Sequence, residues 1–195
     1  MVQINRYFRV LMAKATDFEF VQLTAETQLL PFHCADEDLN HFLIEDAKNY
    51  TIDLMAVTYL LIDKNKKQIA AYYSLLNDKV AYDPQQKGFW NRINRHIHNN
   101  KRRRSYPSVK IGRLAVGDEY ARSGLGSTIL YYIKELYARG NRAGCRFLTV
   151  DAYANATDFY RKNDFEYFTM LDTLDTTRLM YFDLKPFKDS LEQGV

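Results

Sequence analysis

The stretch RLAVGDEYARSGLGSTIL, residues 113–130, carries two glycines one residue apart where a helix should begin. Its first residues are typical of a strand, and the apolar residues from Leu125 onward recur at helical spacing. Glycine inside a helix costs about 1 kcal/mol relative to alanine, so Gly124 and Gly126 are expected to serve this turn. Such glycines let the backbone approach an anion, because the first N–H groups of a helix have no partner within it. Two interpretations stay open here: a phosphate-binding turn, or a place of close helix packing.

The spacing of these glycines excludes two other phosphate-binding motifs. A P-loop requires GxxxxGK[ST], and no lysine follows at that place. A dinucleotide-binding turn requires GxGxxG, and Ile129 stands where the third glycine would be. A phosphate site at this turn therefore has to be of another kind.

The composition is that of an ordinary globular protein, with 47% hydrophobic and 26% charged residues in 195. This length predicts one domain over residues 1–195. No apolar run is long enough to span a bilayer, and MVQINRYFRV is too polar for a signal peptide. Cys34 and Cys145 lack the spacing of a zinc site or a disulfide framework. We therefore expect a cytoplasmic protein with no membrane contact and no metal.

The positive charge is concentrated in one segment. From Pro84 to Gly117 the chain carries nine of its 27 Lys and Arg residues and none of its 24 Asp and Glu residues. We interpret residues at about 84–107 as a basic insertion in the domain. Basic residues interleaved with aromatic ones suit phosphate contacts and base stacking. The candidate nucleic-acid contacts are Arg92, Arg95, Lys101, Arg102, Arg103 and Arg104. The alternative is a solvated surface insertion.

The order of the predicted elements indicates an α+β fold. Helices are predicted over 36–50, with Tyr50 on the apolar face, over 88–98, over 125–139 and after Asn155, whose side chain can cap the last one. Strands are predicted over 55–63, 68–76, 108–116, 146–152, 165–171 and 178–184, the first two joined as a hairpin through KNKK. Pro186 is expected to end regular structure.

Two motifs in this order resemble the GNAT N-acetyltransferase superfamily. Residues 113–130 are similar to its acetyl-CoA-binding motif, a strand and a loop followed by Q/R-x-x-G-x-G/A at the start of a helix. Residues 159–165, FYRKNDF, are similar to its later element F-Y-x-K-x-G-F. The resemblance covers roughly residues 20–184. It implies a mixed, mostly antiparallel central sheet with helices on both faces.

The chain departs from these motifs at two positions. Ala121 stands at the first Q/R position, with Arg122 one place later, and Asp164 replaces the glycine before the final phenylalanine. Pyrophosphate binding at such a loop rests mainly on backbone N–H groups, so Ala121 removes one side-chain contact. Asn163 and Asp164 are among the residues that best tolerate a left-handed helix end.

The resemblance implies an acetyl-CoA-dependent transfer of acetyl to a primary amine by direct attack. It assigns acetyl-CoA binding to Leu114, Ala115, Val116, Arg122, Ser123, Gly124, Leu125, Gly126 and Ser127. Tyr160 matches the tyrosine that protonates the departing thiolate; a packing tyrosine is the alternative, since the chain has fifteen. The strand before the glycines offers Lys110 and Arg113 instead of a carboxylate base. A missing base favours either a weakly basic acceptor such as an α-amine or a relay through water.

The acceptor itself stays unassigned. A looser resemblance, based on the N-terminal pattern and the basic segment, connects the chain to bacterial toxins that acetylate the α-amine of aminoacyl-tRNA. It implies tRNA and a small antitoxin as partners. A second copy of the chain, in a homodimer, is a further candidate partner. A protein amine or a small amine is the other acceptor. The alternative from another class is a non-catalytic nucleic-acid-binding or regulatory module on the GNAT fold.

Overall fold

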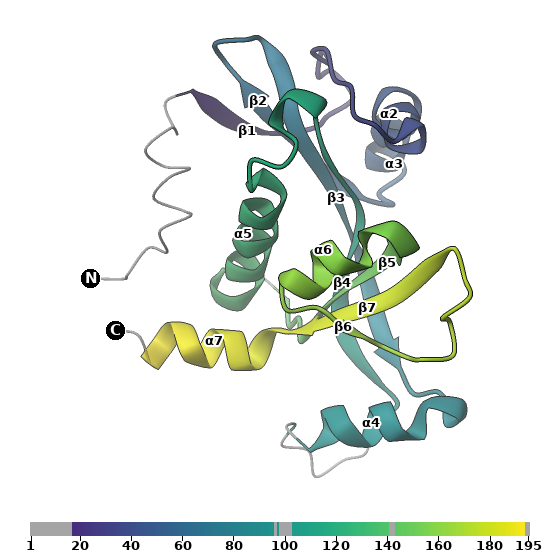
Figure 1. Cartoon of the computed structure of the whole chain (residues 1–195). Helices are drawn as coiled ribbons and strands as arrows, with labels where there is room; N and C mark the ends of the chain where they lie inside the picture. Colours follow the sequence, from purple (N-terminus) through teal and green to yellow (C-terminus); the bar gives the residue numbers. More distant parts are fainter. Residues whose placement is uncertain (1–16, 96, 98–102, 141–142, 194–195) are drawn as a thin grey trace. The chain divides into compact units, whose positions relative to one another are not determined.

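Seven strands form a mixed sheet in the order β1-β2-β3-β4-β5-β7-β6 (Figure 1). The computed structural model describes residues 17–95, 97, 103–140 and 143–193. The strands are β1 Phe18–Gln22, β2 Val57–Asp63, β3 Gln68–Ala81, β4 Ser105–Val116, β5 Phe147–Tyr153, β6 Glu166–Tyr167 and β7 Thr177–Asp183. β4 and β5 pair in parallel, whereas β1 with β2, β2 with β3, and β7 with both β5 and β6 pair antiparallel. The predicted α+β class and mostly antiparallel sheet are confirmed.

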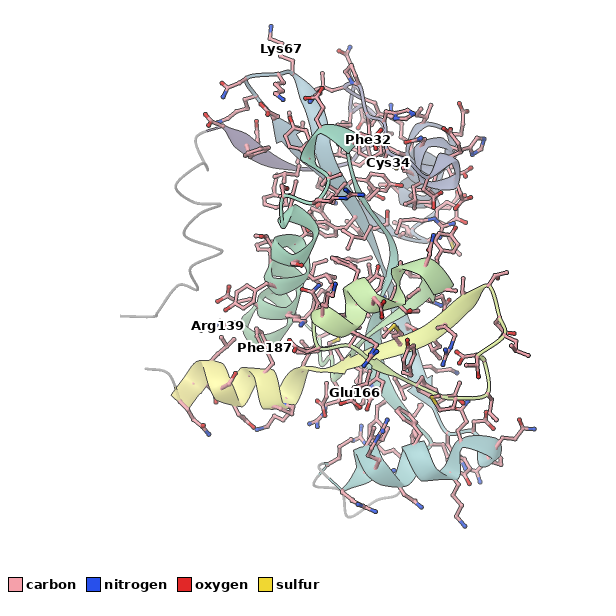
Figure 2. All side chains as sticks on the ribbon, in the orientation of Figure 1. Phe32, Cys34, Lys67, Arg139, Glu166 and Phe187 are labelled. Carbon is pink, nitrogen blue, oxygen red and sulfur yellow. The ribbon has the colours of Figure 1, made fainter. Side chains whose placement is uncertain are left out.

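The chain divides into two compact units, 1–76 with 111–133 and 191–195, and 77–110 with 134–190. The first unit contains the predicted hairpin, β2 and β3, whose register runs from Val57 opposite Leu75 to Asp63 opposite Gln68. Its core gathers apolar residues of the hairpin and of the segment from residue 23 to residue 47. Cys34 belongs to this core and Phe32 packs against it; both are labelled in Figure 2.

The predicted helix over 36–50 is present but interrupted. It consists of α2 (Glu37–His41), a π-helical turn (Phe42–Asp46) and α3 (Ala47–Ile52). Asp36 caps it, because its carboxylate accepts the N–H groups of Asp38 and Leu39 at 3.0 and 3.3 Å. A π-helical turn adds a residue and rotates the apolar face. Tyr50, predicted on that face, is consequently 45% exposed.

The second unit is built on β5, β6 and β7 and on the helices α4 (Lys87–Asn94) and α6 (Thr157–Lys162). Helix α5 (Leu125–Arg139) begins in the first unit and ends in the second. The core of the second unit is largely aromatic and consists of Val80, Phe89, Ile93, Tyr106, Phe147, Phe168 and Tyr181. The helix predicted over 88–98 corresponds to α4, which is shorter and starts one residue earlier. His96 and His98 lie outside the described residues.

Two local predictions are wrong. Pro186 does not end regular structure but lies in the first turn of α7 (Leu184–Gln193), where a helix needs no N–H donor. Asn155 does not cap α6; it belongs to the 3-10 turn Ala154–Ala156, and Ala156 precedes the helix without a side-chain cap.

No helix in the described part of the chain is long and apolar enough to cross a membrane. The described residues also bring together no cluster of His, Cys, Asp and Glu suited to a metal ion.

Candidate active site

The strand β4 leads into the glycine turn through Gly117. Its N–H donates to the Ala70 carbonyl at 2.9 Å, and the next N–H, of Asp118, donates to the His33 carbonyl at 3.1 Å. A Cβ on Gly117 would stand 3.4 Å from the Ala70 oxygen and 3.5 Å from the His33 oxygen. These are ordinary van der Waals distances, so the two backbone hydrogen bonds, and not a need for glycine, fix where the turn leaves the strand.

Tyr120 ties the turn to the β2–β3 hairpin. Its hydroxyl donates to the Asp63 carboxylate at 2.7 Å and accepts the Gln68 amide at 3.0 Å. Burial alone would raise the pKa of Asp63. Hydrogen bonds from the Lys66 amide, the Tyr120 hydroxyl and the Asn65 amide outweigh that effect and hold this pKa below its ordinary value. The charged carboxylate is thus the stable form, and it anchors the residue just before the glycines.

The turn itself contains two residues in the left-handed region, Arg122 with φ 58° and Gly124 with φ 85°. A Cβ on Gly124 would meet nothing within 4 Å, so the dihedral angle, not the space, requires glycine. The Ser123 hydroxyl accepts the Leu125 N–H at 3.3 Å and starts α5. Within the described part of the chain the amides of Arg122 and Gly124 donate no hydrogen bond.

This arrangement fits a diphosphate group. The amides of Arg122 and Gly124 lack a partner among the described residues, and they directly precede the start of a 15-residue helix, where the helix dipole is positive. Arg122 is exposed and adds a cation. Of the strand residues assigned to acetyl-CoA, Ala115 is buried and Leu114 and Val116 are half-buried on β4. The cofactor-binding assignment stays a prediction with a suitable local geometry.

Tyr160 lies in α6, in the second unit, and is 7% exposed. Its ring packs edge-on against Phe159 and Phe165, with centroids 5.1 and 5.5 Å away. Burial raises the pKa of its phenol, so the hydroxyl stays protonated at neutral pH. The described residues offer this hydroxyl no hydrogen-bond partner. The phenol therefore carries the proton that a general acid needs, while burial also makes it a weaker acid; the packing alternative stays open.

A buried lysine that the sequence analysis missed braces the end of α6. Lys134 of α5 is 4% exposed, and its amine donates to the Asn163 carbonyl at 2.5 Å and to the Asp164 carboxylate at 3.3 Å. It also lies over the Phe182 ring, 3.9 Å from the centroid. Burial lowers the pKa of this lysine, and the attraction of Asp164 opposes that effect without reversing it. The signal was its position four residues after Leu130 on the buried helix face.

Lys134 acts on the position where the chain departs from the family motif. Asp164, in place of glycine, adopts φ 63°, whereas Asn163 stays at φ −107°. Of the two residues expected to tolerate a left-handed end, Asp164 is thus the one that adopts it. The N–H groups of Asn163 and Phe165 both donate to the Tyr160 carbonyl at 3.0 Å. The brace therefore reaches the backbone of Tyr160 through one turn of chain.

The basic segment contains one arginine that is paired within the protein and others that are exposed to solvent. Arg92 donates to the Tyr181 hydroxyl at 3.1 Å and lies 3.5 Å from the carboxylate of Glu166, a residue labelled in Figure 2. Arg95, Arg103 and Arg104 are exposed. Lys101 and Arg102 lie outside the described residues. Of the predicted nucleic-acid contacts, Arg92 is thus already engaged within the protein.

The two thiols do not suit nucleophilic catalysis. Burial raises the pKa of Cys34 and raises that of Cys145 to about 11. Both thiols are therefore protonated at neutral pH and poorly nucleophilic.

The sequence model of the acetyltransferase (GNAT) family matches residues 37–165, about two thirds of the chain. The chain belongs to the GNAT acetyltransferase family. This membership confirms the expected enzyme class, an N-acetyltransferase with acetyl-CoA as its donor. No curated protein sequence is significantly similar to the chain.

Solved structures share the GNAT fold with this chain at low sequence identity. The crystal structure of AtaTR bound with AcCoA has a TM-score of 0.69 and 22% identity over 91% of this chain and 98% of that one. AtaT complexed with acetyl-methionyl-tRNAfMet has a TM-score of 0.70 and 21% identity, over 89% and 99%. A mutant AtaT toxin bound to the C-terminus of the antitoxin AtaR has a TM-score of 0.66 and 20% identity, over 90% and 95%. At these identities the likeness establishes the fold.

Proposed function

We propose that this GNAT enzyme transfers acetyl from acetyl-CoA to the α-amine of aminoacyl-tRNA. The observation that carries the acceptor is the segment from Pro84 to Gly117, which holds nine cations and no carboxylate. Its Arg103 and Arg104 stay exposed, as polyanion binding requires. The likeness to AtaT, whose structure was solved with acetyl-methionyl-tRNAfMet, supports the same acceptor class.

Acetyl-CoA is proposed to bind along β4 and the glycine turn. The backbone of Leu114 to Val116 pairs with the pantetheine arm, and the turn from Arg122 to Ser127 receives the pyrophosphate. The free amides of Arg122 and Gly124 support this assignment, because an anion is the natural partner of unpaired N–H groups at a helix start.

The proposed chemistry is direct transfer. The neutral α-amine attacks the thioester carbonyl, a C–N bond forms, the C–S bond breaks, and Tyr160 donates its proton to the departing thiolate. The attacking nitrogen releases one proton to water, and Tyr160 regains its proton from water before the next turnover. A strand N–H near Val116 stabilises the charge on the carbonyl oxygen. An α-amine has a pKa of about 7.7–8.0, so a large fraction is neutral at physiological pH without a protein base. An acceptor that needs no protein base agrees with the strand before the glycines, which carries Lys110 and Arg113 instead of a carboxylate.

The proposed partners follow from the acceptor. Charged tRNA is a cytoplasmic substrate, which places the reaction in the cytoplasm. A small antitoxin is proposed as an inhibitor, supported by the fold shared with an AtaT mutant bound to AtaR. A homodimer is proposed as the working form.

The decisive experiment is label transfer from radiolabelled acetyl-CoA into two parallel pools. One pool holds charged tRNA with uncharged tRNA as control, and the other holds polyamines, amino acids and peptides. We expect label on charged tRNA alone. Label on a peptide or small amine would keep the chemistry and replace the acceptor. No label in either pool, together with no acetyl-CoA binding by calorimetry, would favour a non-catalytic binding module.

A further inference from the structure

A cavity of about 810 Å³ lies in the second unit, beside α4. Its lining combines two aromatic rings, Tyr82 and Trp90, with three cations, Lys87, Arg103 and Arg104. Among the described residues, Asn91, Asn94 and Ile97 also line the cavity. The cavity is formed by residues between the end of β3 and the start of β4. It uses none of the residues assigned to acetyl-CoA or to proton transfer.

The cations of this cavity are not neutralised by the protein. Among the described residues, no carboxylate forms an ion pair with Lys87, Arg103 or Arg104. All three are exposed. Arg92, on the same helix, contrasts with them because Glu166 and Tyr181 hold it. The cavity therefore presents three free positive charges and suits an anionic ligand.

Stacking and hydrogen bonds hold the aromatic part of the cavity in place. Trp90 stacks on buried Tyr106, with ring centroids 5.2 Å apart and planes 25° apart. The Tyr106 hydroxyl donates to the Asn94 side-chain oxygen at 2.5 Å, and the Asn94 amide donates to the Trp90 carbonyl at 2.7 Å. Tyr82 meets Trp90 edge-on at 5.5 Å and stays 38% exposed. Trp90 is thus a fixed ring at the cavity wall, with an accessible second ring beside it.

We propose that this cavity binds unpaired nucleotides of a nucleic acid strand, with a base against Trp90 and Tyr82 and phosphates at Lys87, Arg103 and Arg104. Stacking on aromatic rings together with cations along the backbone is how proteins hold single strands. A duplex keeps its bases stacked inside and cannot use the rings. An acidic peptide matches the charges but leaves the aromatic walls unused. The identity of the strand as tRNA rests on the proposed function; the binding itself does not.

The test uses Trp90, which is the only tryptophan in the chain. The full-length protein is titrated, without acetyl-CoA, with an unstructured RNA octamer while tryptophan fluorescence and binding are recorded. Parallel titrations use the abasic form of that octamer, the corresponding duplex and polyglutamate. We expect the octamer to change Trp90 fluorescence and to bind at least about tenfold more tightly than its abasic form, the size expected of base stacking. Affinity should fall steeply with salt.

Matched variants separate the ring from the charge. Tyr82→Leu should weaken binding of the octamer and leave binding of its abasic form unchanged. Tyr153→Leu, at a tyrosine that is also 38% exposed, should change the binding of neither. Arg103→Gln/Arg104→Gln should weaken binding of both the octamer and its abasic form. Its control, Lys64→Gln/Lys67→Gln, removes the same charge from the exposed hairpin turn.

Several results would overturn the inference. Equal binding of the octamer and its abasic form would leave only a polyanion patch. Binding of duplex or polyglutamate as tight as that of the octamer would reject unpaired nucleotides as the ligand. No binding by a protein that acetylates charged tRNA would reject the cavity and leave the proposed function standing. Octamer binding without any tRNA acetylation would reject the proposed acceptor and leave the cavity.

Discussion

Two left-handed turns of this GNAT enzyme have opposite local chemistry. In the first turn the amides of Arg122 and Gly124 donate no hydrogen bond to the described residues, and Tyr120 ties this turn to Asp63. The turn at Asp164 has its groups satisfied, because Lys134 reaches the Asn163 carbonyl and the Asp164 carboxylate. Unpaired groups make a turn ready for a ligand, whereas paired groups make it rigid. We therefore propose that the first turn binds the cofactor and that the second positions Tyr160.

The largest expected effect tests the chemistry that the second turn positions. Tyr160→Phe should lower kcat by about 10- to 1000-fold, because the departing thiolate loses its proton donor. The dissociation constant of acetyl-CoA should stay within about twofold, because the change removes one hydroxyl that acts in the transition state. Steady-state kinetics and calorimetry measure the two quantities. Tyr153→Phe, at a half-exposed position, is the control. Unchanged kcat would make Tyr160 a packing residue.

Strain at the first turn should appear in binding. Alanine at a left-handed position costs about 1–2 kcal/mol, so Gly124→Ala should weaken acetyl-CoA binding by about 5- to 30-fold. Gly144→Ala is the matched control, because its Cβ also meets nothing within 4 Å and its φ is not left-handed. Calorimetric titration compares them. If both variants bind alike, the turn does not hold the pyrophosphate.

The lysine brace should affect turnover more than cofactor binding. Lys134→Met keeps the apolar stem but leaves a buried carbonyl without its donor, which costs roughly 1–3 kcal/mol of unfolding free energy. We expect a roughly fivefold lower kcat, since small misplacements near the reacting atoms slow the reaction. Lys162→Met, at an exposed lysine, is the control.

A second substitution distinguishes positioning from simple loss of stability. Asp164→Gly restores the family residue and relieves the strain of φ 63°. Added to Lys134→Met, it should recover part of kcat. In a Tyr160→Phe background, Lys134→Met should lower kcat little further. Full additivity in that background would show that Lys134 does not act through Tyr160.

The smallest expected effect is a pH dependence of stability. Burial holds the pKa of folded Lys134 below the ordinary 10.5. Between the folded and the unfolded pKa the unfolded chain binds more protons, so the free energy of unfolding should rise with pH in that alkaline window. Below the folded pKa this contribution is lost. Denaturant unfolding at several alkaline pH values should show the rise in the wild type and not in Lys134→Met. Equal slopes in both would contradict it.

Local patterns were enough to predict most of the elements and both motifs. The glycine spacing at residues 124–126 and the FYRKNDF stretch act within single turns, where residue type directly limits φ and N–H pairing. Predictions failed where the geometry of a helix differed from the one that the residue pattern suggested. A π-helical turn leaves Tyr50 exposed, and Pro186 lies within the first turn of α7 instead of after a strand.

The sequence alone determined the α+β class, the family and the acid-free basic segment, because each depends on residues close together in the chain. The tertiary structure decided which charges are free. Arg92 and Arg104 look alike in sequence, yet only Arg92 meets Glu166 and Tyr181, which are more than 70 positions further along the chain. The spacing of Lys134 from Leu130 places it on the apolar face of its helix, but its partners Asn163 and Asp164 are about 30 positions further along the chain. The pairing of a charge depends on distant segments brought together, and no local pattern contains it.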